Sequence, residues 1–191
     1  ERTREIKEKN EQILDSIRYS KRIQDAILPM EDKLTRVFPQ HFIIFMPRDI
    51  VSGDFYWFSQ LGDDVFLAVA DCTGHGVPGA LLAMMGDIFL NEIVNTNRIL
   101  DPARILEELH KRVRIHLKQN EAEAETMDGM DVCLCRIERN NGKMHFAGAK
   151  RPLYIVSANG SNNSRKEYKL DIVRGDRKSI GGRQKETSRI Y

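Results

Sequence analysis

DDVFLAVADCTGHGVPGALLAMM, residues 63–85, carries the pattern from which the architecture of this chain can be predicted. Its apolar run 65–70 has the length of a buried strand, and the run ends at an acidic residue, Asp71. Glycines crowd the next turn, which suits a sharp bend or a close approach of the backbone to a ligand. A helix is predicted from Pro78 onward, because apolar residues then recur at three- and four-residue spacing. The unit is therefore a strand, a carboxylate, a glycine turn and a buried helix.

Three kinds of chemistry use turns of this type. Residues 74–79, GHGVPG, match the dinucleotide-binding pattern G-x-G-x-x-G, but residues 95–102 are polar where that fold needs a second strand. A cysteine phosphatase would need an arginine six residues after Cys72, and Pro78 stands there. The third chemistry uses Asp71 as a metal ligand, which requires partners elsewhere in the chain. We favour the metal site and keep nucleotide binding as the weaker alternative.

A partner for Asp71 is expected upstream, in residues 48–58, RDIVSGDFYWF. Asp54 follows a glycine and begins an aromatic run that is typical of a strand. Two consecutive strands would then each present a carboxylate near the same edge of a sheet. Carboxylate oxygens at such positions suit Mg²⁺ or Mn²⁺, because both ions prefer hard oxygen ligands.

Two segments carry a family resemblance: SGDFYWF, residues 52–58, and VADCTGHGVPGALLAMMG, residues 69–86. They strongly resemble the bacterial PPM-type serine/threonine phosphatases of the RsbU/SpoIIE group, and the likeness runs from about Arg48 to the end of the chain. The resemblance implies an α+β fold, with two antiparallel sheets packed as a β-sandwich and flanked by helices. It also implies two Mn²⁺ or Mg²⁺ ions, with Asp54, Asp71 and the backbone carbonyl of Cys72 as metal ligands.

The same resemblance implies a function. Family members dephosphorylate phosphoserine or phosphothreonine on proteins, so we expect a metal-dependent protein phosphatase that acts as the output domain of a bacterial signalling protein. The expected partner is a phosphoprotein substrate such as a small anti-sigma-factor antagonist. In the expected mechanism a metal-activated hydroxide attacks phosphorus in line, and no phosphoenzyme forms.

Arg48 and His75 complete the predicted catalytic set with Asp54 and Asp71. Arg48 lies between two predicted strands and suits a phosphate clamp, because a guanidinium holds two phosphoryl oxygens at once; the alternative is a solvated loop arginine. His75 suits a general acid that protonates the leaving serine oxygen. The alternative for His75 is a turn histidine that caps or packs.

Residues 1–30 are predicted to form a linker helix that precedes a phosphatase domain at residues 31–191. Ile6, Ile13, Ser20 and Ile27 are spaced seven apart, which is a weak heptad pattern. One interpretation is a surface helix that packs on the domain. The other is a parallel coiled coil that pairs two protomers and joins the domain to a sensor, since the resembled family commonly has such a helix. We favour the second interpretation, a homodimer regulated through this helix.

The remaining elements follow from local patterns. Residues 42–46, FIIFM, are predicted to form a buried strand, and Asp101 and Pro102 to start a helix in which His110 and His116 lie on the surface. Four more strands are predicted at residues 130–137, 143–147, 152–157 and 168–173, the first pair joined by the turn at 140–142, NNG. Asp128 and Asp131 are weaker candidates for the metal site, and Lys150 and Arg151 for contact with a phosphoprotein substrate; for all four we favour the alternative of no specific role.

Composition bounds the alternatives. The chain has 191 residues, 41% of them hydrophobic, which is enough for one domain and an appendage. A net charge of +2 argues against a nucleic-acid-binding protein, and three cysteines form no even disulfide framework, which favours the cytoplasm. We find no signal peptide and no apolar run long enough to cross a membrane, so we expect no direct membrane insertion. The location would be cytoplasmic, as a free protein or as the cytoplasmic part of a membrane-bound sensor.

The end of the chain departs from the family pattern. Family members continue into further strands and helices that supply two late metal-binding aspartates, and residues 174–191 contain neither. We therefore expect a domain that is incomplete at its C-terminus, with about half of a two-metal site; both an active and an inactive chain are compatible with this pattern. The alternative function is a non-catalytic regulatory or dimerising interaction module with a degenerate or truncated phosphatase fold.

Overall fold

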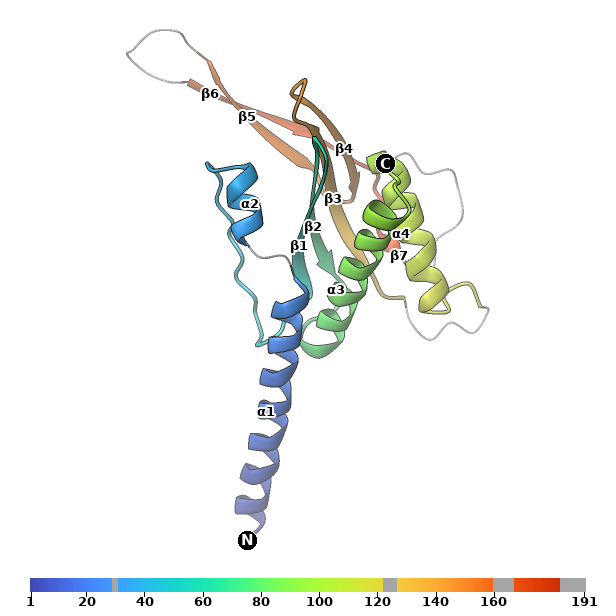
Figure 1. Ribbon diagram of the computed structural model, residues 1–191. Coiled ribbons are helices and arrows are strands. Elements are labelled where there is room, and N and C mark those ends of the chain that lie inside the picture. The colour runs from blue at the N-terminus through green and yellow to red at the C-terminus, as the bar shows by residue number, and fades with distance from the viewer. Residues whose placement is uncertain (29–30, 122–126, 160–166, 183–191) are drawn as a thin grey trace.

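The computed structural model describes residues 1–28, 31–121, 127–159 and 167–182. A long helix, α1 (Arg2–Ile27), and a short one, α2 (Glu31–Val37), precede the first strand. A central sheet follows, with α3 (Gly76–Asn91) and α4 (Pro102–His116) packed on one face (Figure 1). A separate two-stranded sheet projects from the far side of the molecule.

The central sheet has five strands, and all pairings between its named strands are antiparallel. Its strands are β1 (Asp54–Leu61), β2 (Asp64–Cys72), β3 (Gly129–Glu138), β4 (Lys143–Ala149) and β7 (Ile180–Gly181). The first four lie side by side in chain order, and β7 pairs with the beginning of β3. The second sheet pairs β5 (Leu153–Asn159) with β6 (Glu167–Val173). The predicted α+β class with antiparallel sheets is thus confirmed. Most of the predicted loop between β5 and β6, and the tail after residue 182, lie outside the described residues.

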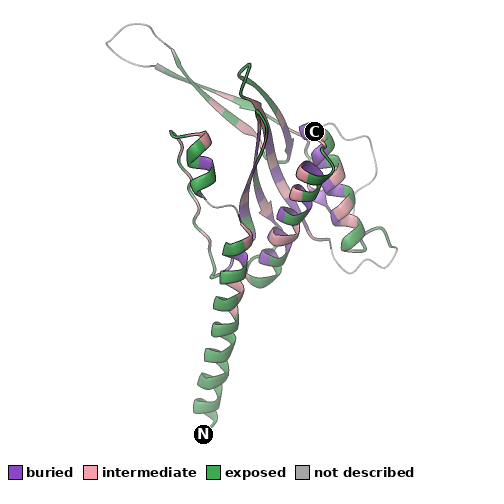
Figure 2. Cartoon of the chain, in the orientation of Figure 1, coloured by how far each residue is buried: buried purple, intermediate pink, exposed green. Residues whose placement is uncertain are grey.

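Alternation along the strands separates the two faces of the sheet. On β1, Phe55 and Trp57 are buried on the face that α3 and α4 cover, whereas Asp54 and Tyr56 lie on the opposite, outer face. The core lies between the sheet and the two helices (Figure 2). The outer face is more open, and Val69 at its centre is 62% exposed.

Helix α3 continues through a π-helical turn, Glu92–Thr96, so that Gly76–Thr96 is one helical stretch of 21 residues. It is long and apolar enough to cross a membrane, and the expectation that no such run exists was wrong. In this fold 56% of its most apolar window is buried within the protein. Packing against the sheet and α4 is sufficient reason for its apolar composition.

Helix α4 begins as predicted, because the Asp101 carboxylate accepts a hydrogen bond from the Arg104 amide at 2.9 Å. The prediction that His110 lies on the surface was wrong. His110 is buried, and its Nδ1 accepts a hydrogen bond from the Gly181 amide of β7 at 2.9 Å. The histidine thus ties α4 to the short edge strand, whereas His116 is exposed as expected.

The predicted strand at residues 42–46 was also wrong. This segment is extended but pairs with no strand among the described residues, and Phe42, Ile44 and Met46 are 83%, 78% and 86% exposed. Its β-prone composition needed a ladder partner to become a strand, because isolated extended backbone gains no inter-strand hydrogen bonds. The segment runs beside the outer face of the sheet (Figure 1).

Most of α1 projects away from the domain (Figure 1), and only its C-terminal turns pack on it. Ile6 and Ile13 of the heptad positions are 53% and 57% exposed. Gln24 is the exception, at 1% exposure: its amide nitrogen donates to the Ser52 carbonyl at 2.7 Å and its amide oxygen accepts from the Ser52 amide at 3.0 Å. This pair of hydrogen bonds fixes α1 to the loop that leads into Asp54.

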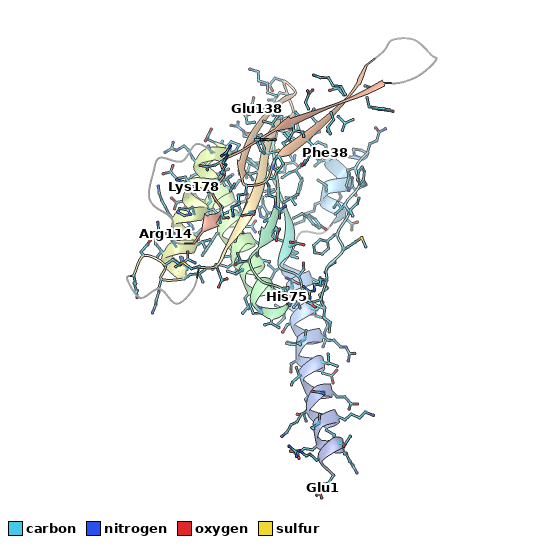
Figure 3. All side chains as sticks on the ribbon, turned by 180° about the vertical axis from the view of Figure 1, so that it is seen from behind. Glu1, Phe38, His75, Arg114, Glu138 and Lys178 are labelled. Atoms are coloured by element: carbon cyan, nitrogen blue, oxygen red, sulfur yellow. The ribbon has the colours of Figure 1, made fainter. Side chains whose placement is uncertain are left out.

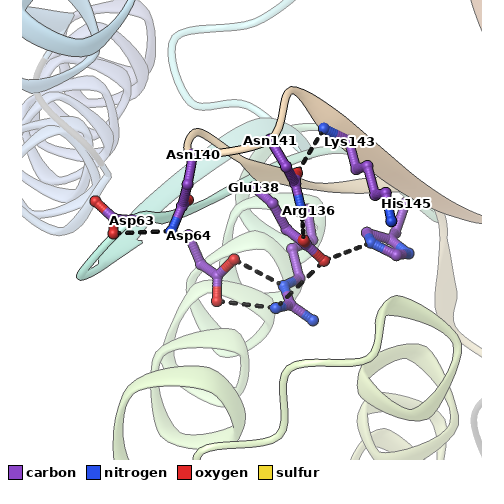
Figure 4. Close-up of polar contacts among 8 residues, drawn as sticks. All are labelled: Asp63, Asp64, Arg136, Glu138, Asn140, Asn141, Lys143 and His145. Carbon is purple, nitrogen blue, oxygen red and sulfur yellow. Dashed lines mark hydrogen bonds and ion pairs between the residues drawn. The ribbon is translucent and has the colours of Figure 1, made fainter.

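The β3–β4 hairpin closes at Asn140, Asn141 and Gly142, as predicted, with Gly142 at φ 68°. Together with the neighbouring turn between β1 and β2, this hairpin carries a cluster of charged and amide side chains, which we call the hairpin cluster (Figure 4): Asp63, Asp64, Arg136, Glu138, Asn140, Asn141, Lys143 and His145. Both nitrogens of the Arg136 fork bind Asp64 at 3.0 Å, and Glu138 binds His145 at 2.7 Å. These contacts lock the ends of β2, β3 and β4 together.

Candidate active site

Asp54 and Asp71 lie directly opposite one another in the ladder between β1 and β2. Asp54 is the first residue of its strand, and Asp71 is the second-last residue of its own. Directly paired residues in an antiparallel ladder point to the same face of the sheet, with Cβ atoms about 5 Å apart. The structure therefore brings together the two carboxylates that the sequence predicted as metal ligands.

A third carboxylate extends this arrangement. Asp131 of β3 is the ladder partner of Asp71 on the other side, so Asp54, Asp71 and Asp131 form a line across three strands, which we call the acid row. All three lie on the outer face, away from α3 and α4. Like charges directly opposite each other in a sheet are destabilising, so the acid row needs cations.

The backbone around the acid row is packed at close range by glycines. A Cβ at Gly79 would lie 2.7 Å from the Gly74 carbonyl oxygen, and a Cβ at Gly53 would lie 3.0 Å from the same atom. Side chains at these positions would separate the loop before β1, the turn after β2 and the first turn of α3. The glycine turn therefore serves close packing around the carboxylates.

The Cys72 side chain lies on the helix face of β2 and is buried. Burial, with a smaller contribution from the Asp54 charge, raises the pKa of the Cys72 thiol to about 12. The thiol is therefore protonated at neutral pH, and its side chain lies on the face of the sheet opposite to the acid row. Metal binding by the backbone carbonyl of Cys72 stays a prediction.

His75 is the N-cap residue of α3 and is exposed. Its Nδ1 is 2.9 Å from Asp49 Oδ2, so the ring is oriented by a carboxylate of the loop before β1. Arg48 precedes Asp49 in this loop and is exposed, and its side chain has no hydrogen bond or ion pair with the described residues. The hydrogen bond thus joins His75 to the loop that also carries Arg48, and among the described residues neither side chain forms a hydrogen bond or ion pair with Asp54 or Asp71.

The contact between Arg151 and Asp71 was not predicted from the sequence. Its guanidinium hydrogen-bonds the Asp71 carboxylate, and both side chains are 46% exposed. Beside it, the Lys150 ammonium is 3.8 Å from Asp131, which also accepts a hydrogen bond from the Ser179 hydroxyl at 2.5 Å. Two consecutive basic residues directly after a predicted strand were the sequence signal for a cation near the site. The signal did not name Asp71 as the partner, because 80 residues of sequence separate Arg151 from Asp71.

A cavity of about 810 Å³ adjoins this end of the sheet on its outer face. Asp54, Asp71 and Arg151 lie along its polar side, and the extended segment 42–46 and the start of β5 supply apolar walls. The cavity thus places two carboxylates and one guanidinium beside open space. A phosphorylated side chain is small compared with this volume.

The donor set fits Mn²⁺ or Mg²⁺, because it consists of carboxylate oxygens on rigid strand ends with room for water ligands. Among residues 1–28, 31–121, 127–159 and 167–182, no group of three His, Cys, Asp or Glu side chains is close enough to hold a metal ion. Asp54 and Asp71 are therefore a partial donor set.

Comparisons with known proteins agree with this geometry. Residues 62–171 match the family of stage II sporulation protein E, SpoIIE. The SiaA-PP2C domain of Pseudomonas aeruginosa is similar in structure, with a TM-score of 0.74 and 35% identity, covering 90% of this chain. The chain spans 64% of the length of that structure. No curated protein matches the chain.

Two further solved structures are similar over part of the chain. The RsbU and RsbW domains of a Mycobacterium tuberculosis protein match at 17% identity and a TM-score of 0.45, covering 68% of this chain and 38% of that one. RsbX in complex with magnesium matches at 16% identity and a TM-score of 0.40, covering 65% and 61%. The family match over most of the chain and the likeness to SiaA-PP2C are sufficient: this chain belongs to the SpoIIE family of PPM-type phosphatase domains.

Proposed function

We propose that this chain is the output domain of a bacterial signalling protein and hydrolyses phosphoserine or phosphothreonine on a regulatory protein in the cytoplasm. The observation that supports the proposal most directly is the ladder pairing of Asp54 with Asp71 beside a cavity. PPM phosphatases generally depend on Mn²⁺ or Mg²⁺, and hard oxygen donors at this position suit either ion. A small anti-sigma-factor antagonist is the proposed substrate, by analogy with the family.

Each predicted residue has a proposed role at this end of the sheet. Asp54 and Asp71, with the Cys72 carbonyl, would hold the metal, which when bound supplies an activated water for attack on phosphorus. His75 would hold the proton for the leaving serine oxygen, and Asp49 orients its ring at 2.9 Å. Arg48, in the same loop, would bind the phosphoryl oxygens.

The N-terminal helix is proposed to pair two protomers. The support is its shape: its first turns leave the domain, and the apolar residues Ile6 and Ile13 are more than half exposed there. Burial of such residues against a second helix stabilises a coiled coil. Sedimentation of the chain beside the variant Ile13→Glu tests this proposal. A dimer that the substitution converts to a monomer supports pairing through α1, and a monomer in both cases contradicts it.

Mn²⁺-dependent hydrolysis of a phosphoserine peptide tests the enzymatic function. The assay compares this chain with a form extended to the length of the SiaA-PP2C domain, each with an Asp71→Ala control. Activity in the extended form that the substitution abolishes would support the phosphatase. Absence of both activity and Mn²⁺ binding in either form would favour the alternative, a regulatory interaction module.

A further inference from the structure

The contact between Arg151 and Asp71 occupies the carboxylate that the proposed function assigns to a metal. Asp71 is the central member of the acid row, with Asp54 on one side and Asp131 on the other. Arg151 binds Asp71, and the adjacent Lys150 approaches Asp131 at 3.8 Å. Two consecutive cations thus neutralise two neighbouring carboxylates.

The backbone that carries Arg151 is held firmly by the fold. The Lys150 amide donates to the Asp176 carbonyl at 2.7 Å, and the Asp176 amide donates to the Gly148 carbonyl at 2.7 Å. Lys150 itself has φ 58°, and Pro152 restricts the backbone of Arg151 to extended conformations. The start of the Arg151 side chain is therefore fixed beside the acid row, while its guanidinium, at 46% exposure, keeps room to move.

A divalent cation and the Arg151 guanidinium compete for the same oxygen. Asp71 Oδ2 accepts the hydrogen bond from Arg151, and two cations at one carboxylate oxygen repel each other. Metal binding at Asp71 therefore requires this ion pair to open. The displaced guanidinium remains tethered at the cavity that it lines, close to where a phosphoryl group would meet the metal.

We propose that Arg151 is an exchangeable counter-cation of Asp71, which holds the carboxylate until a divalent metal binds and is then released to the phosphoryl oxygens of the substrate. The inference rests on the proposed function, because it assumes that Asp71 is a metal ligand. The same guanidinium would lower the affinity of the site for metal and raise its affinity for a phosphorylated substrate. Arg151 is thus a positioning residue before metal binding and a substrate-binding residue after it.

Calorimetric titration with MnCl₂ alone tests the first half of the exchange. We expect Arg151→Gln to bind Mn²⁺ about 3- to 10-fold more tightly than the unchanged chain, as the loss of a half-exposed, charge-assisted ion pair implies. Arg139→Gln is the matched control, because it removes an exposed arginine from the far hairpin. Its Mn²⁺ affinity should stay within about 2-fold of the unchanged chain, since distant surface charges are screened.

Two more variants separate the ion pair from a general effect of charge. Lys150→Gln removes the neighbouring cation, which faces Asp131, and an equal gain in Mn²⁺ affinity from it would overturn the proposal. In an Asp71→Asn background, Arg151→Gln should change Mn²⁺ affinity no further. Arg151→Lys, which keeps the charge, should bind Mn²⁺ less tightly than Arg151→Gln.

The outcomes distinguish this proposal from the function on which it rests. Equal or weaker Mn²⁺ binding by Arg151→Gln, with an unchanged melting temperature, would overturn the exchange and leave the metal site intact. Failure of both the unchanged chain and Arg151→Gln to bind Mn²⁺ would overturn the metal site and the exchange together. For the second half, Arg151→Gln in the extended form should raise KM for a phosphoserine peptide while Arg139→Gln does not; an unchanged KM would contradict the role in substrate binding.

Discussion

Charged side chains gather at both ends of the central sheet, but they are arranged differently. In the hairpin cluster, Arg136 grips Asp64 with two hydrogen bonds at 3.0 Å, and these two side chains are 22% and 19% exposed (Figure 4). In the acid row, three carboxylates lie side by side across three strands; among the described residues Arg151 binds the central one, Asp71, and Lys150 approaches Asp131. His75 and Glu138, labelled in Figure 3, mark the two ends.

The hairpin cluster has the arrangement expected of charges that stabilise a fold, whereas the acid row has the arrangement expected of a proposed cation-binding site. The hairpin cluster matches each carboxylate to an arginine, histidine or amide within the strands that it joins. The acid row places like charges opposite each other, a destabilising arrangement, beside a cavity and glycine-packed backbone. Such an arrangement is expected where a site is built for a cation rather than for stability.

Neutralising one aspartate at each end should give the largest contrast. We expect Asp71→Asn to lower Mn²⁺-dependent phosphatase activity of the extended form by about 100-fold or more, because the proposed metal ligand is lost. Asp64→Asn should leave activity unchanged and lower the free energy of unfolding by about 1 kcal/mol, since Arg136 loses its charged partner. Hydrolysis of a phosphoserine peptide measures the activity of each variant, and chemical denaturation measures its free energy of unfolding. Equal activity losses in the two variants would contradict the separation of roles.

Asp87 sharpens the comparison, because it is a carboxylate buried in α3 whose partner is a neutral amide, Asn91, at 2.9 Å. Burial raises its pKa from 3.8 to about 6, and the hydrogen bond from Asn91 opposes this in part. The native state therefore keeps the Asp87 proton to higher pH than the unfolded chain. The contribution of protonated Asp87 to the free energy of unfolding is complete below about pH 4 and is lost as pH rises through about 6.

Asp87→Asn should accordingly stabilise the protein at pH 7 by up to about 3 kcal/mol and have little effect at pH 4. Urea denaturation across this range measures the difference between the variant and the unchanged chain. A stabilisation that is the same at both pH values would show that Asp87 does not titrate with a raised pKa.

Glycines test whether close backbone packing is special to the site. Gly79→Ala should lower the free energy of unfolding by about 2 kcal/mol, because its Cβ would lie 2.7 Å from the Gly74 carbonyl oxygen. Gly62→Ala, at the hairpin end, has nothing within 4 Å of the new Cβ, so only its φ of 60° costs about 1 kcal/mol. Thermal unfolding compares the two. A larger loss of stability in Gly62→Ala than in Gly79→Ala would contradict the inference that close backbone packing is special to the site.

The smallest effect concerns the link between α1 and the site. Gln24→Ala leaves the Ser52 amide and carbonyl without their partner, which should cost about 1 to 2 kcal/mol of stability. Gln12→Ala, on the exposed part of the same helix, should cost less than about 0.5 kcal/mol. Differential scanning calorimetry separates these values. Equal melting temperatures would mean that the Gln24 contact adds no stability.

Much of the fold followed from local sequence patterns. Apolar runs and turn residues predicted β1 to β6, α1, α3 and α4 to within a few residues, and Asp101 was recognised as the cap of α4. Residues 42–46 failed because β-propensity reports a preference for pairing but says nothing of whether a partner strand exists. His110 failed because its burial depends on β7, which contacts α4 from 71 residues away.

The family, most strand and helix positions and the choice of Asp54 and Asp71 as candidate ligands could be read from the sequence, because these depend on motifs and on periodicity within short segments. Three features became visible only in the folded chain: the ladder register that aligns Asp131 with Asp71, the ion pair from Arg151 and the anchoring of Gln24 on Ser52. The physical reason is that register and loop routing join residues 28 to 80 positions apart, and a pattern of local burial carries no information about such contacts.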